Sequence, residues 1–336
     1  MMQGVTAVSA GSASLRQLAK RFAFRILGSS PRVLRRIHQV EDANLVTILN
    51  FHRVAKNDGS GYPPLEPILF SQILDFLVEN FTITTFGDLG NRTAKKQEKP
   101  SVILSFDDGY KDFVTNTIPE LTRRGLKCNQ NIIPACVENG LPPLNVAVQD
   151  YIGKTSYKEY SKLSLDGFEW NSSNSSEKES LRVSAYLKNL PHDQQSHIFT
   201  ELLHEHGDEI RSLATPMMDL GDLKDIVDIC EIGCHSFSHS NMGNESNEYF
   251  QSDLRKCKSW FRSAISIQPR IYAFPNGSYR QQQLDIAHHE GFETVLLVGD
   301  NFSKAQNSIH FRYGMSPRTI SEAKFQITGK FTKINQ

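Results

Sequence analysis

Two adjacent aspartates and two spaced histidines are the residues of this sequence best suited to catalysis. Asp107 and Asp108 end the apolar run 102–106, where two carboxylates are costly to bury unless they hold a cation or do chemistry. His235 and His239 follow another apolar segment much later in the chain. One carboxylate and two imidazoles form a common ligand set for a catalytic metal that keeps a position open for water. The other carboxylate is then free to act as a base on that water.

The composition narrows the choice of partners and compartment. Lys+Arg and Asp+Glu both number 37 in 336 residues, so the net charge is zero and nucleic acid is not an expected partner. The five cysteines include no CxxC pair, which argues against a disulfide framework and favours a reducing compartment. We see no apolar stretch long enough to span a membrane and no secretory signal, and we expect a cytoplasmic protein.

Residues 1–40 differ from the rest of the chain in their charge. They carry seven basic residues and no acid, and Leu15, Leu18, Phe22 and Ile26 recur at helical spacing. This pattern fits a basic amphipathic helix lying on an anionic membrane surface. It also fits an organelle transit peptide, or a helix that packs its apolar edge on the domain. We treat residues 1–40 as an N-terminal extension with possible peripheral membrane contact.

The rest of the chain alternates between strand and helix patterns, which predicts a parallel α/β architecture in one domain over residues 41–330. Strands are expected near residues 44–51, 81–85, 102–106, 131–133, 229–233, 270–274, 294–298 and 310–313. Residues 151–216 break the alternation and predict a helical insertion, in which the polar run 171–176 reads as a flexible loop. The candidate residues all fall at or just after strand ends, where the loops of an α/β barrel converge.

Three segments resemble motifs of the polysaccharide deacetylases with NodB homology, also called carbohydrate esterase family 4. The aspartate strand resembles the first motif, and Cys234 to His239 resembles the zinc-binding H-S/T-x-x-x-H motif. The segment Ala273 to Gly277 resembles the third motif in the exopolysaccharide-deacetylase subgroup, whose opening segment is also similar to His52-Arg53. The resemblance extends over roughly residues 44–320, and the helical insertion matches least.

This resemblance implies a distorted (β/α)7-type barrel, similar to a TIM barrel, and assigns roles to the motif residues. Asp108, His235 and His239 would bind Zn²⁺, or another divalent metal such as Co²⁺ or Ni²⁺, and Asp107 would be the catalytic base. A bound Zn²⁺ lowers the pKa of a water to about 7 and polarises a carbonyl. A backbone N–H near Tyr110 could complete the oxyanion site.

The sequence departs from the family pattern at two catalytic positions. Where many members have an arginine before the third-motif proline, this chain has Ala273, and Arg312 is the candidate to orient Asp107 instead. The Leu-x-His tripeptide that carries the general acid is absent, and His310 is the candidate in that region. His52 could face the substrate or simply end a strand, and Pro275 could contact the substrate or shape a loop.

We therefore expect a metal-dependent hydrolase that removes N- or O-acetyl groups from a carbohydrate, with an acetylated polysaccharide or a lipid-linked glycan as substrate. A catalytically weak carbohydrate-binding relative and a hydrolase of a non-sugar amide are the alternatives.

Overall fold

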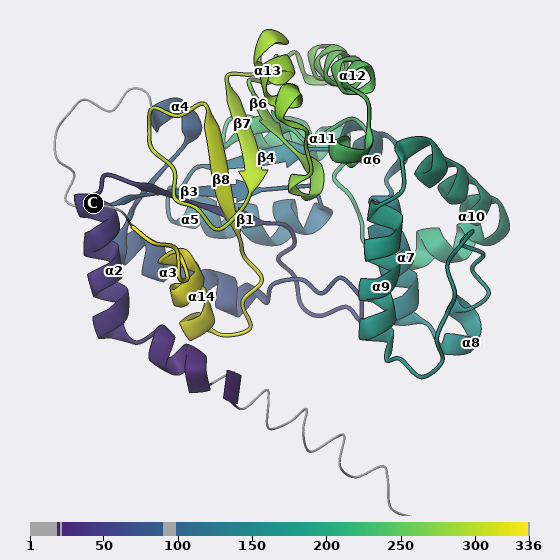
Figure 1. Cartoon of the computed structure of the whole chain (residues 1–336), viewed down its shortest axis with the longest axis horizontal. Helices are drawn as coiled ribbons and strands as arrows, with labels where there is room; N and C mark the ends of the chain where they lie inside the picture. The colour runs from purple at the N-terminus through teal and green to yellow at the C-terminus, as the bar shows by residue number, and fades with distance from the viewer. Residues whose placement is uncertain (1–18, 21, 90–98, 335–336) are drawn as a thin grey trace, which may run out of the picture.

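The computed structural model describes residues 19–20, 22–89 and 99–334 (Figure 1). The strands are β1 (Val46–Phe51), β2 (Thr82–Thr84), β3 (Ser101–Phe106), β4 (Cys128–Ile132), β5 (Cys230–Cys234), β6 (Ile271–Ala273), β7 (Thr294–Val298) and β8 (Ile309–Gly314). The helices are α2 (Ser30–Asp42), α3 (Pro67–Asn80), α4 (Phe86–Leu89), α5 (Ile118–Arg123), α6 (Pro134–Asn139), α7 (Leu144–Lys154), α8 (Tyr157–Tyr160), α9 (Ser176–Lys188), α10 (His192–Leu213), α11 (Leu220–Ile226), α12 (Asn247–Ile265), α13 (Gln281–His289) and α14 (Ile320–Ile327).

Seven parallel strands close into a barrel. Their order is β1-β8-β7-β6-β5-β4-β3, and β3 pairs again with β1 along its whole length, from Val46↔Ser101 to Phe51↔Phe106. The short β2 pairs with the first half of β3 and stays outside this ring. The expected distorted (β/α)7 barrel is thereby confirmed.

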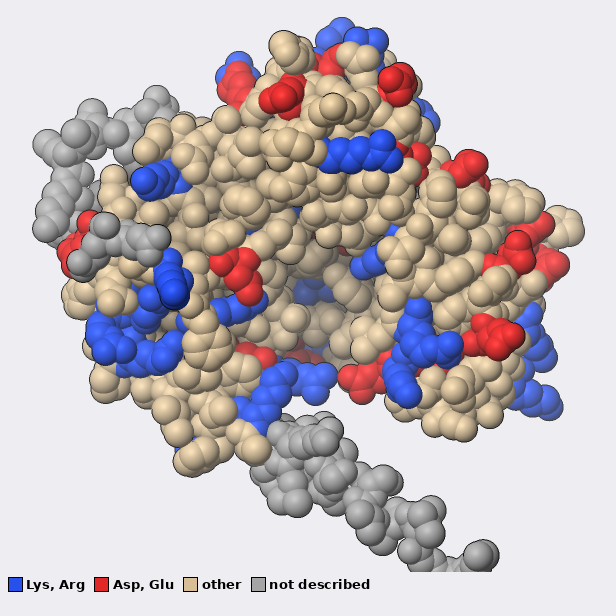
Figure 2. Space-filling view, viewed as in Figure 1, with Lys and Arg blue, Asp and Glu red and all other residues tan. Residues whose placement is uncertain are grey.

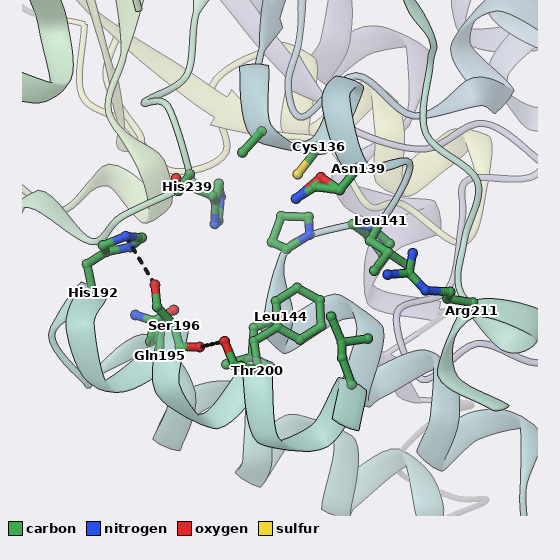
Figure 3. A pocket seen from close by; sticks show the side chains of 16 residues that line it. Cys136, Asn139, Leu141, Leu144, His192, Gln195, Ser196, Thr200, Arg211 and His239 are labelled. Atoms are coloured by element: carbon green, nitrogen blue, oxygen red, sulfur yellow. Dashed lines mark hydrogen bonds between the residues drawn. The ribbon is translucent and has the colours of Figure 1, made fainter. Parts of the chain in front are cut away.

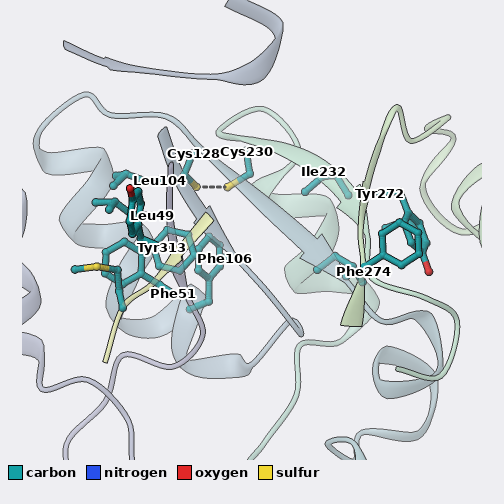
Figure 4. Close-up of a cluster of buried hydrophobic side chains, with 14 of the residues drawn as sticks. Leu49, Phe51, Leu104, Phe106, Cys128, Cys230, Ile232, Tyr272, Phe274 and Tyr313 are labelled. Atoms are coloured by element: carbon teal, nitrogen blue, oxygen red, sulfur yellow. Dashed lines mark hydrogen bonds between the residues drawn. The ribbon is translucent and has the colours of Figure 1, made fainter. Parts of the chain in front are cut away.

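Each strand turns one set of side chains outward, toward the helices, and the other set into the barrel. Leu49, Phe51, Leu104 and Phe106 face outward into the main hydrophobic core (Figure 4). In the same layer the Sγ atoms of Cys128 and Cys230 lie 3.3 Å apart as free thiols on neighbouring strands. This outer layer fixes which side chains face inward.

The helical insertion consists of α7 to α10 and has a hydrophobic core of its own. That core includes Ile152, Val183, Leu187 and Leu202, separate from the main core. The insertion begins at Leu144, somewhat earlier than the sequence pattern indicated. The polar run 171–176 is ordered as a helix cap: Ser175 accepts a hydrogen bond from the backbone N–H of Lys178, and Asn174 donates to the buried Glu179.

The N-terminal extension is described only in part, because residues 1–18 and 21, with Leu15 and Leu18, lie outside the described residues. Helix α2 buries Val33, Ile37 and Val40 and belongs to the barrel's outer layer. Ahead of it, Phe22 and Ile26 are exposed to 65% and 57%. Among the described residues, no helix has the length and apolar character needed to cross a membrane.

Candidate metal centre and active site

The candidate site lies where β3 and β5 end, at the carboxyl mouth of the barrel. Asp107 and Asp108 follow β3 directly, and His235 follows β5. Asp108 has a φ of 76°, and His239 a φ of 61°, in the left-handed region that non-glycine residues rarely adopt. Such strained conformations persist only where surrounding contacts hold them in place, and they cluster at functional sites.

Asp108, His235 and His239 form the one group of three metal-ligating side chains found among the described residues, with ligand atoms within 4.8 Å of one another. The Oδ1 atom of Asp108 lies 3.4 Å from Nε2 of His235 and 3.6 Å from Nε2 of His239. Two ligands at about 2.0–2.1 Å from a tetrahedral metal lie about 3.3 Å apart. The two measured separations are therefore close to those of a loaded site.

The chemistry of these donor atoms also fits a divalent metal. Oδ1 of Asp108 is buried and has no hydrogen-bond partner among the described residues. Nδ1 of His235 lies 2.8 Å from the carbonyl oxygen of Ala273, which makes Nδ1 the protonated nitrogen and leaves Nε2 free for a metal. Burial lowers the pKa of His239 to about 3, so its imidazole is neutral, as metal binding requires.

Asp107 is held beside this group by a buried cation. Arg312, fully buried on β8, donates from Nη1 to Oδ1 at 2.7 Å and from Nη2 to Oδ2 at 2.9 Å. Burial by itself raises the pKa of Asp107, but the Arg312 guanidinium and then His235 outweigh it and hold that pKa well below its usual range. Asp107 is thus an oriented, ionised carboxylate, and its Oδ2 lies 3.9 Å from Nε2 of His235.

Two asparagines that sequence reasoning missed complete the support of Asp107. Asn50 on β1 donates to Oδ2 at 3.0 Å, and Asn131 on β4 donates to Oδ1 at 2.8 Å. Ser105 on β3 joins the same network by accepting from Arg312 at 2.9 Å. The sequence contains a signal for them, because each is a polar residue at an inward position of a strand that is buried throughout. Gly233 belongs to this network by its small size, because a Cβ there would lie 2.1 Å from Oδ1 of Asn131.

The loop that carries both histidines is fixed by Asp253 of α12, a second contribution that the sequence did not reveal. Asp253 is buried and accepts from the backbone N–H of Phe237 at 3.0 Å and from the hydroxyl of Ser236 at 3.2 Å. Ser236 Oγ in turn accepts from the backbone N–H of Ser240. Burial raises the pKa of Asp253 to about 6, against the opposing effect of these hydrogen bonds. Asp253 therefore anchors both sides of the turn between His235 and His239.

His52 and Tyr110 lie near the metal ligands. Burial lowers the pKa of His52, while the charges of Asp108 and Asp107 act in the opposite direction. Tyr110 is buried, and burial together with the Asp108 charge raises the pKa of its phenol well above the usual range. The ring of Tyr62 contacts both residues, at centroid distances of 6.1 Å and 6.4 Å.

Within the described part of the chain, Pro275 and His310 make no hydrogen bond to the metal ligands or to Asp107, and the structure locates them differently. Pro275 is buried and begins the short 3-10 turn that follows β6. His310 lies two residues before Arg312 on β8, about 6–7 Å further into the barrel. Its ring packs on Phe86 of α4 at 5.4 Å, and Phe86 belongs to an apolar cluster with Val46 and Ile271 at the starts of β1 and β6. The structure thus places His310 toward the amino end of the barrel, away from the metal ligands.

An open groove leads to the site from the side of His52. It has a volume of about 680 Å³ and is lined by barrel loops, including Tyr62 and Met315, and by Ser176 and Leu181 of the insertion. Figure 2 shows the surface hollowed between the barrel and the insertion. The site is therefore accessible to a large substrate.

Comparisons with known proteins agree with this geometry. Residues 218–295, which include both histidines, match the model of the polysaccharide deacetylase family. The Uncharacterized protein YlxY of Bacillus subtilis is 31% identical over 70 residues, which cover 21% of this chain and 22% of that protein. The match thus spans about a fifth of this curated relative.

Two solved deacetylase-type structures share the fold. The deacetylase PplD of Streptococcus pyogenes, in complex with acetate, gives a TM-score of 0.54 at 15% identity and covers 84% of this chain and 98% of its own. IcaB from Ammonifex degensii gives a TM-score of 0.55 at 14% identity, with coverage of 85% and 97%. The family model indicates a relationship in sequence over residues 218–295, and the two solved structures show the same barrel fold. Residues 218–295 thus resemble the polysaccharide deacetylase family, and the barrel as a whole has the fold of these solved structures.

Proposed function

We propose that this protein is a metal-dependent deacetylase that hydrolyses N- or O-acetyl groups on a carbohydrate. The observation that carries the proposal is the triad of the buried Asp108 and His235 and the half-buried His239, directly beside the ionised Asp107. This combination provides a metal ligand set and a separate base, which together are suited to hydrolyse an amide or ester at neutral pH.

The triad would hold a divalent metal such as Zn²⁺, Co²⁺ or Ni²⁺, which when bound acidifies a water and polarises the acetyl carbonyl. The Ala273 carbonyl fixes the tautomer of His235, and Asp253 fixes the loop that carries His239. Ala273 and Asp253 thus orient the two histidine ligands toward the metal position.

Asp107 acts on the proton of the attacking water. As an ionised carboxylate it accepts that proton while the water oxygen bonds to the acetyl carbon, and Arg312 with Asn50 keeps the carboxylate aligned. Protonated Asp107 then returns the proton to the nitrogen or oxygen of the sugar as the bond to the acetyl carbon breaks. The products are acetate and a free amine or hydroxyl. This cycle needs no contribution from His310, which lies deeper in the barrel.

The open groove favours a glycan chain over a small amide as substrate. The groove beside His52 lies between barrel loops and the insertion, and so offers an extended surface (Figure 2).

The test is acetate release by the zinc-loaded protein from a panel of acetylated oligosaccharides, acetylated xylan and small acetamides. We expect turnover of oligosaccharides that a chelator abolishes and added zinc restores. Metal binding without any acetate release would support the carbohydrate-binding alternative. Turnover confined to the small acetamides would support the non-sugar alternative.

We also propose that the N-terminal extension contacts anionic membranes and brings the enzyme close to a lipid-linked glycan. Phe24 packs on Phe325 of α14, and this packing leaves Phe22 and Ile26 exposed beside basic residues. Each basic residue near an anionic leaflet adds about 1 kcal/mol. A variant lacking residues 1–27, which keeps α2, should lose co-sedimentation with phosphatidylglycerol vesicles and keep turnover of soluble substrates. Unchanged vesicle binding would refute this membrane contact.

A further inference from the structure

A second pocket lies on the other side of the metal ligands, between the barrel and helix α10 of the insertion (Figure 3). It has a volume of about 300 Å³, and His239 and Ser238 form the part of its wall next to the metal centre. Loop 141–143 and the start of α7 form another wall. The pocket thus opens directly onto a metal ligand, and half of its lining residues belong to the insertion.

One face of α10 lines this pocket. The lining residues recur at helical spacing, which puts them on a single stripe: His192, Gln195, Ser196, Phe199, Thr200 and Leu203. Ile198 and Leu202, on another face of the helix, are buried in the core of the insertion. Helix α10 therefore turns a second stripe toward the pocket, and Phe199 and Leu203 of this stripe also pack against the core of the insertion.

Hydrogen bonds tie α10 to the loop of the metal ligand. Nδ1 of His192 lies 3.1 Å from Oγ of Ser240, the residue after His239, and Nε2 lies 3.2 Å from Oγ of Ser196. The backbone N–H of His192 donates to Glu245 at 2.7 Å. The pocket is thus held in a fixed position relative to His239.

The pocket combines an aromatic and apolar wall with polar side chains and one cation. Phe199 and Leu144 supply apolar surface, while Asn139 and Thr200 supply amide and hydroxyl groups. None of the lining residues is Asp or Glu. The Arg211 side chain points into the pocket and has no carboxylate partner among the described residues (Figure 3).

We propose that this pocket binds a sugar unit next to the acetylated one, and that this unit carries an acidic group which pairs with Arg211. The inference rests on the proposed function and names its substrate class: an acetylated glycan that contains uronate or a similarly acidic sugar. An aromatic ring with amide and hydroxyl groups suits a sugar ring, and a guanidinium suits a carboxylate. The insertion, and not the barrel, then determines which glycan is accepted.

The test compares two tetrasaccharides that differ in charge. Tetra-N-acetylchitotetraose is neutral, whereas the hyaluronan tetrasaccharide alternates N-acetylglucosamine with glucuronate. Binding to the zinc-loaded protein is measured by calorimetry in an Asp107→Asn background, which removes turnover. Arg211→Gln should weaken binding of the hyaluronan tetrasaccharide about tenfold and leave that of chitotetraose unchanged. Lys162→Gln, an exposed charge change on the insertion outside the pocket, is the matched control and should change neither.

Phe199→Ala should weaken binding of both oligosaccharides, because it removes the apolar surface and no charge. Equal affinity of the Arg211→Gln variant for the hyaluronan tetrasaccharide would overturn the proposal, as would equal losses for both ligands or an unaffected Phe199→Ala. Failure of both tetrasaccharides to bind would overturn it too. Acetate release by the unmodified protein would in that case still support the deacetylase function, so the two failures are distinguishable.

Discussion

The interior of the barrel contains two layers of side chains, a lower one that is mainly apolar and an upper one that is polar. The lower layer, toward the amino ends of the strands, includes Ile48, Ile103 and Leu296. The upper layer lies nearer the carboxyl ends of the strands and includes Asn50 and Ser105, two residues after Ile48 and Ile103, and Arg312 on β8. All six are at most 2% exposed.

The difference shows how one barrel divides folding from function. The lower layer needs only close packing, and burying such side chains contributes roughly 1.5–3 kcal/mol each. The upper layer buries an ion pair and its hydrogen-bond partners, which adds little net stability because desolvation offsets the attraction. The upper layer lies at the mouth of the barrel because its side chains hold Asp107 in one orientation.

Removing the cation of the upper layer should have the largest effect. Arg312→Met leaves Asp107 buried without its counter-charge, which we expect to lower the free energy of unfolding by about 3–5 kcal/mol. Urea denaturation of the metal-free protein measures this. The double variant Arg312→Met/Asp107→Asn should recover much of the stability while remaining inactive.

Leu296→Ala, in the apolar layer, is the matched control. It should cost about 2–5 kcal/mol and yet leave the turnover of folded molecules near normal. If Leu296→Ala abolished turnover of folded protein while Arg312→Met did not, the division between the layers would be wrong.

A smaller effect should follow from Asp253, which acts on the metal through the histidine loop. Asp253→Ala removes the acceptor for Phe237 N–H and Ser236, and should lower zinc affinity about 10–100-fold. Asp253→Asn, which keeps one acceptor oxygen, should lose less. Competition with a chromogenic chelator measures both, and the exposed Glu248→Ala on the same helix is the control. Unchanged zinc affinity in Asp253→Ala would show that the loop between His235 and His239 keeps its conformation without Asp253.

The smallest effect concerns His310 and depends on pH. Burial lowers its pKa to about 4, below the ordinary value of 6.5. Between pH 6.5 and 4 the unfolded chain therefore binds a proton that the folded chain does not, and stability falls as the pH is lowered. In His310→Leu the loss of stability between pH 7.5 and 5.5 should be smaller by about 1 kcal/mol.

Urea denaturation of the metal-free protein at the two pH values checks this, with the exposed His197→Ala as control. Turnover of His310→Leu should stay near normal. A collapse of turnover in the folded variant would instead restore His310 as a candidate general acid.

The strands were predictable from local sequence and the barrel from the family resemblance, whereas the support of the site was predictable from neither. Branched residues in short runs predicted the strands, as at β1 and β7, and the Asp107-Asp108 pair marked the end of β3. Asn50 and Asn131 were missed because their partner lies on another strand, and only barrel closure brings the three together.

The insertion was predicted as helical, but its details depend on contacts distant in sequence. The run 171–176 has the composition of a loop, yet Ser175 caps helix α9, and Asn174 donates a hydrogen bond to Glu179 of that helix. The role of Asp253 on α12, outside the insertion, likewise depends on a contact distant in sequence, its hydrogen bond from the backbone N–H of Phe237. In both cases the local pattern was correct for the element and silent about the partner.

The most direct test of the account is the metal content of two variants that differ by one position. Asp107→Asn should retain about one zinc per chain and lose turnover by about 10² to 10⁴, because Asp107 acts as base and the ligand set remains complete. Asp108→Asn should lose the metal, since it removes the carboxylate that joins His235 and His239. Metal lost from Asp107→Asn and kept by Asp108→Asn would contradict the assignment of base and ligand.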